Sequence, residues 1–179
     1  MRPRQFRTGP ILAVLLFLLV LWPAMQLYGM LKPSHTSSDP LAMLYEVAQF
    51  QISLWQGTMQ EAKRYESTAP LNKVKLVAYS ANYTHDRLVR AVGGDRLAPL
   101  PGLSRFVEFI TVLQISGDRQ LTDLEREVLE QAAAIAPELS DCYSGLFHTS
   151  GKIIGSKNEA LQAADQRLAE TLERYFQPQ

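Results

Sequence analysis

Three histidines and one cysteine are the residues of this sequence best suited to catalysis or metal binding. His35, His85 and His148 are widely separated, and Cys142 stands six positions before His148. Side chains that share one face of a helix lie three or four residues apart, and a metal site on a helix uses that spacing. We therefore predict no catalytic residue, no cofactor, no cofactor-binding residue and no metal site, and we expect a protein that is not an enzyme.

His85 and Cys142 have the positions of core residues instead. His85 lies between Ala81 and Leu88, at the three- and four-residue steps of an apolar helix stripe. We predict a buried, neutral imidazole that is hydrogen-bonded to a carbonyl or hydroxyl group; a solvated ring at a groove mouth and a pH sensor or ligand contact are the alternatives. Cys142 continues another such stripe, which favours a buried structural thiol over an intermolecular disulfide or a nucleophile.

Charge is unevenly distributed along the chain. Positions 118–141 hold seven acidic and two basic residues, whereas positions 67–96 hold five basic and two acidic residues. Two such helices could be neighbours that attract each other, or each could be solvated, or the acidic one could dock a basic partner. The candidate docking face consists of the carboxylates of Asp123, Glu127, Glu130, Glu138 and Asp141.

Apolar residues at alternating three- and four-residue steps predict an antiparallel bundle of four to five amphipathic helices over residues 40–179. The first helix is expected from Pro40, after the N-cap Asp39, to about Tyr65. A second apolar stripe predicts that more than one neighbour packs on this helix, and its residues are Met43, Val47, Phe50 and Leu54.

The next two helices are bounded by prolines and glycines. One is expected between Pro70 and Gly93, and the stretch 95–102, with two prolines, is expected to be a loop. The other runs from Leu103 to Gly117. No stretch alternates as a strand does, so the predicted fold class is all-α.

Two capping boxes mark the last helices. Thr122 with Glu125 opens one, and Ser156 with Glu159 opens the other. Pro137 lies inside the first of these helices and predicts a kink or a break there.

The N-terminal region predicts membrane attachment. Residues 11–31 are apolar and uncharged and would form a helix of about 31 Å, close to the thickness of a bilayer core. Arg2, Arg4 and Arg7 precede them, which favours a cytoplasmic N-terminus. We predict a cytoplasmic basic tail (1–10), a transmembrane signal anchor (11–31), a polar linker (32–39) and an extracytoplasmic bundle (40–179); a cleaved signal peptide and a buried soluble helix are the alternatives.

Composition limits the partners of the exported part. Residues 33–179 carry 14 basic and 18 acidic groups, so we expect no nucleic-acid binding. The leading hypothesis is a single-pass protein of the cytoplasmic membrane that docks another envelope protein through helix faces, without catalysis. Trp55, Tyr79 and Tyr83 are candidate anchors wherever they are exposed. Homo-oligomerisation is left open, and a sensory ligand-binding bundle is the alternative.

One resemblance adds to this hypothesis. The loop Leu100-Pro101, the pair Phe106 and Ile110, and the run 121–125 (LTDLE), which opens a helix to Leu139, resemble the N-terminal region of the YpeB family of spore-germination proteins. Proteins of that family also have a membrane anchor followed by a helical domain, and their C-terminal repeat domains have no counterpart here. The resemblance implies an accessory protein of the cell envelope.

Overall fold

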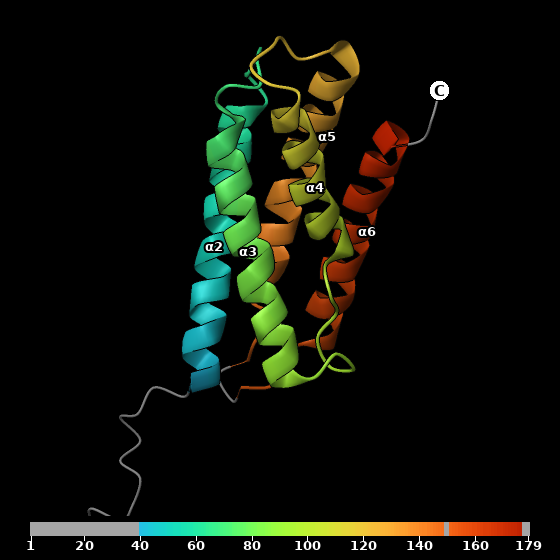
Figure 1. Ribbon diagram of the computed structural model, residues 1–179. Coiled ribbons are helices and arrows are strands. Elements are labelled where there is room, and N and C mark those ends of the chain that lie inside the picture. Colours follow the sequence, from blue (N-terminus) through green and yellow to red (C-terminus); the bar gives the residue numbers. More distant parts are fainter. Residues whose placement is uncertain (1–39, 149–150, 177–179) are drawn as a thin grey trace, which may run out of the picture. The chain divides into compact units, whose positions relative to one another are not determined.

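Five α-helices dominate the part of the chain that the computed structural model describes, residues 40–148 and 151–176 (Figure 1). They are α2 (Pro40–Ala62), α3 (Leu71–Val92), α4 (Pro101–Ile115), α5 (Asp123–Tyr143) and α6 (Gly155–Phe176). These residues form no strand, only the isolated bridges Ser67–Gln120 and Phe147–Ile153. The all-α class and the helical bundle are confirmed.

The predicted membrane anchor is not among the described residues. Its segment (11–31), the basic tail, the linker and the N-cap Asp39 all fall outside them. Within residues 40–148 and 151–176, no helix combines the length and apolar character needed to cross a bilayer.

The five helices form a closed ring in which each packs against two others. α2 contacts α3 and α5, α6 contacts α4 and α5, and α4 contacts α3. Successive helices run in opposite directions in Figure 1, so the neighbours are antiparallel except for α4 and α6, which run in parallel. The apolar stripes meet inside the ring, where Trp55 packs edge-on against Phe106 with ring centroids 5.6 Å apart.

α5 continues through Pro137, so of the predicted kink or break, the break does not occur. A proline has no N–H to donate, which leaves the carbonyl four residues earlier without its helical partner. That carbonyl belongs to Ala133, and the side-chain amide of Gln60 on α2 donates to it at 2.8 Å. A neighbouring helix thus replaces the hydrogen bond that the proline removes.

The two predicted capping boxes have different outcomes. Thr122 and Glu125 form both reciprocal hydrogen bonds at the start of α5, which confirms the first. The Glu125 carboxylate also pairs with Arg119, and this hydrogen-bonded pair lowers the pKa of Glu125 to about 2. The second prediction is wrong, because α6 begins at Gly155 and Ser156 lies inside the helix.

A buried carboxylate from α6 caps the N-terminus of α4. The side chain of Asp165 accepts hydrogen bonds from the backbone N–H groups of Gly102 (2.7 Å) and Leu103 (2.9 Å). Gly102 permits this close approach, because a Cβ there would lie 2.2 Å from the backbone oxygen of Asp165. Burial nevertheless raises the pKa of Asp165 to about 6, against the effect of the two N–H donors.

Candidate functional site

The described residues contain no group of three or more histidine, cysteine or acidic side chains arranged to hold a metal ion. Cys142 is half-buried against the core rather than fully buried, its thiol is free, and burial raises its pKa. An elevated pKa disfavours the thiolate, which is the reactive form of cysteine. Cys142 therefore has the environment of a structural residue.

His85 is fully buried, as its position in the apolar stripe predicts. Its Nε2 lies 3.0 Å from the carbonyl oxygen of Ala98, and its Nδ1 lies 2.6 Å from the hydroxyl of Tyr143. Because a carbonyl only accepts, Nε2 carries the hydrogen, and the Tyr143 hydroxyl donates to Nδ1. Burial lowers the pKa of His85 to about 4, so the ring is neutral at pH 7. This geometry is that of a satisfied core histidine.

The five predicted docking carboxylates are all exposed and follow one line along α5. Their spacing of three, four or eight residues places them opposite the buried stripe of that helix. Two of them already form ion pairs within the chain, because Asp123 pairs with Arg126 and Glu138 pairs with Arg167. The five carboxylates do lie along one side of α5, but ion pairs within the chain neutralise part of their negative charge. The role of this acidic line as a docking face stays a prediction.

The basic helix does not cover this acidic line. α3 packs against α2 and α4, whereas α5 packs against α2 and α6. The predicted attraction between neighbouring acidic and basic helices is therefore wrong for α3 and α5. Two basic residues of α3 pair with other acids instead, Lys73 with Glu61 of α2 (2.7 Å) and Arg90 with Asp86 of α3 (3.7 Å).

Seven of the ten large apolar side chains that are exposed among the described residues lie on α2 and α3. We call this set the α2/α3 face; it consists of Met43, Val47, Phe50, Leu54, Leu76, Tyr79 and Tyr83. α2 packs against two neighbours, α3 and α5, as predicted, but the side chains of its second stripe remain exposed. Trp55 is not part of this face, because it is fully buried.

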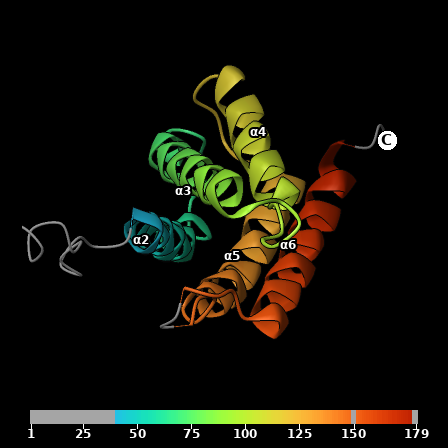
Figure 2. The same ribbon diagram turned by 90° about the horizontal axis from the view of Figure 1, so that it is seen from below.

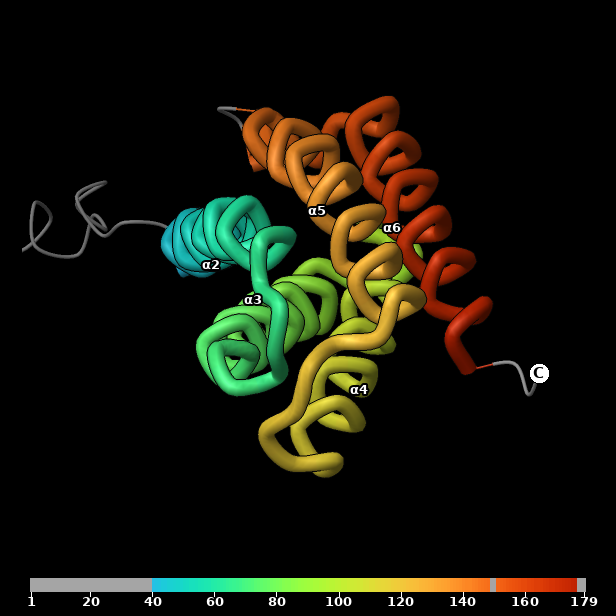
Figure 3. Tube along the Cα trace, turned by 90° about the horizontal axis from the view of Figure 1, so that it is seen from above, coloured from blue at the N-terminus to red at the C-terminus, as the bar shows by residue number. Residues whose placement is uncertain are grey.

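The arrangement of the helices explains why this face is open. Figures 2 and 3 look along α2 and α3 and show them side by side at one edge of the ring, with α5 beyond α2 and α4 beyond α3. α2 turns its core stripe inward and directs Tyr45, Ser53 and Gln60 toward α5. Its remaining apolar stripe therefore points out of the bundle.

Aromatic and cationic groups add to the α2/α3 face. The rings of Tyr79 and Tyr83 stack with centroids 6.2 Å apart, and the guanidinium carbon of Arg87 lies 4.7 Å from the centroid of Tyr83. Exposed tyrosines beside an arginine have the composition of interface anchors. Of the candidate anchors predicted from the sequence, Tyr79 and Tyr83 are exposed, whereas the sequence did not predict that the second stripe of α2 is open.

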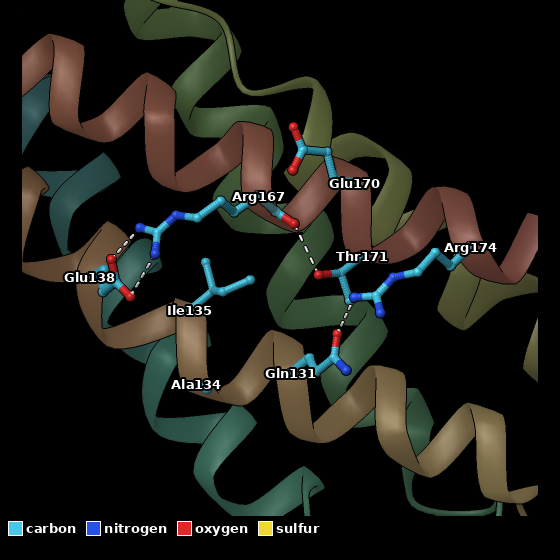
Figure 4. A pocket seen from close by; sticks show the side chains of 8 residues that line it. All are labelled: Gln131, Ala134, Ile135, Glu138, Arg167, Glu170, Thr171 and Arg174. Atoms are coloured by element: carbon cyan, nitrogen blue, oxygen red, sulfur yellow. Dashed lines mark hydrogen bonds and ion pairs between the residues drawn. The ribbon is translucent and has the colours of Figure 1, made fainter.

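A second surface feature lies between α5 and α6. This open hollow of about 400 Å³ is lined by eight residues, among them Glu138, Arg167 and Arg174 (Figure 4). Arg167 pairs with Glu138, and Arg174 donates to Gln131, so both guanidinium groups are engaged by the walls of the hollow. A charged ligand would have to break these contacts in order to bind in the hollow.

Comparison with known proteins leaves the chain without a relative to argue from. No protein-family model, curated protein or solved structure matches it. Its function is therefore inferred from its own residues.

Proposed function

We propose that this protein is a non-enzymatic docking module of the cell envelope, in which residues 11–31 anchor the helical bundle to the cytoplasmic membrane and the bundle binds protein through a helix face. The observation that carries the proposal is the α2/α3 face. Large apolar side chains gathered on one exposed side of a domain are typical of binding sites.

The shape of the face fits recognition by helices. Two adjacent antiparallel helices present their apolar stripes side by side, an arrangement that accepts one or two further helices by the packing used inside the bundle. Charged residues of α3, such as Arg87 and Arg90, lie beside the apolar side chains of the face. An apolar centre with a polar rim is the common organisation of protein interfaces.

The membrane part of the proposal rests on the sequence. Residues 11–31 contain no charge, and three arginines precede them. By the positive-inside rule the N-terminus is cytoplasmic and the bundle lies on the other side of the membrane. The acidic line of α5, from Asp123 to Asp141, would be a second surface there, available to a basic partner.

Site-specific photo-crosslinking in membranes tests this function. A photoreactive amino acid replaces Phe50 or Tyr79 of the full chain, and in a matched control it replaces Ile115, which is 80% exposed but belongs to α4. We expect protein adducts from the first two positions and none from the third. Face positions that give no adduct, or no more than the Ile115 position, would refute docking through this surface.

A further inference from the structure

The α2/α3 face has the size of half an interface. Its seven side chains are between 41% and 62% exposed. If a large apolar side chain presents about 200 Å² in full, they expose on the order of 700 Å². A stable standard-size complex buries about 800 Å² on each partner, whereas the largest apolar patch of a typical monomer is about 300–600 Å². One equally large surface would cover the face.

The charges on α2 allow this surface to meet a copy of itself. A twofold contact brings identical patches together, so like charges within the patch would repel each other. α2 contains two charged residues, Glu46 and Glu61, and Glu61 pairs with Lys73 of α3. Its outward apolar stripe therefore holds no charge that a second copy would oppose.

Glu46 lies at an edge of the face and forms no ion pair with any described residue. Steps of seven residues align it with Ser53 and Gln60, whose side chains contact α5, so Glu46 lies on the side of α2 away from its own α3. Arg90 continues the line of Leu76 and Tyr83 on α3 in the same seven-residue steps. It has only an exposed, 3.7 Å contact with Asp86.

The Glu61–Lys73 ion pair provides a common reference point on the two antiparallel helices. The height of a residue is its distance from this pair along the helix axis. At about 1.5 Å per residue, Glu46 lies about 22 Å from the pair along α2, and Arg90 lies about 26 Å from it along α3 in the same direction. Phe50 and Tyr83 correspond in the same way, at about 16 Å and 15 Å. Glu46 thus lies at nearly the height of Arg90, and Phe50 lies at that of Tyr83.

We propose that the α2/α3 face joins two copies of this chain in a dimer whose twofold axis runs parallel to the helices, with α2 of each copy packed on α3 of the other. The proposal rests on the proposed function, because anchors in one membrane give both copies the same direction. Rotation by 180° about such an axis brings α2 of one copy opposite α3 of the other. It does not change the position of any residue along the helix direction. Glu46 of one copy therefore faces Arg90 of the second copy, and Phe50 faces Tyr83.

Charge reversal in two differently tagged full-length copies tests this pairing. Both are expressed together, purified through one tag in mild detergent, and the other tag is quantified. Glu46→Arg or Arg90→Glu in both copies should lower recovery severalfold, because each dimer then holds two like-charged pairs. One copy with Glu46→Arg and the other with Arg90→Glu should restore recovery, since both pairs are opposite again. The control Glu108→Arg reverses an exposed charge on α4, outside the α2/α3 face and the acidic line, and should change nothing.

A second variant tests the apolar contact without relying on ion pairs. Leu54→Glu places a charge within the α2 stripe of the face, where the side chain is 41% exposed, and it should weaken the dimer at least tenfold. Ile115→Glu is the matched control outside the face. Circular dichroism checks that each variant is folded.

The outcomes separate this inference from the proposed function. Loss of recovery with Leu54→Glu and rescue by the paired reversals would establish the dimer. A chain that does not self-associate, self-association indifferent to Leu54→Glu, or single reversals that the mixed pair does not rescue would overturn it. If Phe50 crosslinks only to a different protein, the docking function stands and the dimer is refuted.

Discussion

The neutral state of His85 makes a quantitative prediction. Its pKa is about 4 in the folded protein and 6.5 as an ordinary histidine, so the unfolded chain binds a proton more readily. Stability supplied by the neutral ring is therefore complete above pH 6.5 and is lost as the pH falls toward 4. Between pH 7.5 and pH 5 the free energy of unfolding should fall by about 2 kcal/mol on this account.

A second buried group opposes this change in the parent protein. Burial raises the pKa of Asp165 to about 6 from 3.8, so the folded state binds its proton more readily. This contribution stabilises the protein as the pH falls, by about 1.4 kcal/mol over the same interval. The parent should then lose only about 0.6 kcal/mol, and the effect of His85 must be isolated with a variant.

His85→Gln provides that variant, because glutamine offers one acceptor and one donor and does not titrate. The stability difference between parent and variant should shrink by about 2 kcal/mol from pH 7.5 to pH 5. His85→Leu should show the same pH dependence but lower stability throughout, since the buried Tyr143 hydroxyl and Ala98 carbonyl lose their partner. The control Tyr143→Phe retains a titratable ring and should keep the parent's pH dependence.

Urea unfolding, followed by far-ultraviolet circular dichroism at half-unit pH steps, measures these differences. The reasoning fails if His85→Gln and the parent keep a constant stability difference over the whole interval. An imidazole whose NMR titration in the folded state has a midpoint near 6.5 would refute it independently.

Three further predictions concern the fold and its attachment. Gly102→Ala should cost more than about 2 kcal/mol in urea unfolding, since its Cβ would lie 2.2 Å from the Asp165 backbone oxygen; the control Gly57→Ala, with open space around its Cβ, should be neutral or stabilising by up to about 1 kcal/mol. Residues 40–179 alone should unfold cooperatively from a helical state, because the helices of the described residues already enclose an apolar core; a non-cooperative transition would contradict this. Protease added to right-side-out membranes should digest the bundle of the full chain, whereas complete protection would place it in the cytoplasm.

Periodicity in the sequence determined the local structure and the direction of many side chains. Apolar residues repeating every three and four positions predicted the helices and placed His85 on a buried helix face. In a helix, residues at that spacing lie on the same face. Thr122 and Glu125 predicted the start of α5, since a capping box is completed within four residues. These features depend on residues close together in the chain, so a linear pattern contains them.

Only the tertiary structure decided which helices meet. The Asp165 carboxylate caps α4 from 63 positions away, and Gln60 supplies the hydrogen bond that Pro137 cannot make. No local sequence pattern predicts these long-range hydrogen-bond partners. The order of the ring likewise separated the basic α3 from the acidic α5 and left the second stripe of α2 uncovered. An apolar stripe shows that a helix face avoids water, but several packings of similar helices bury a comparable area, so the stripe does not specify which surface covers it.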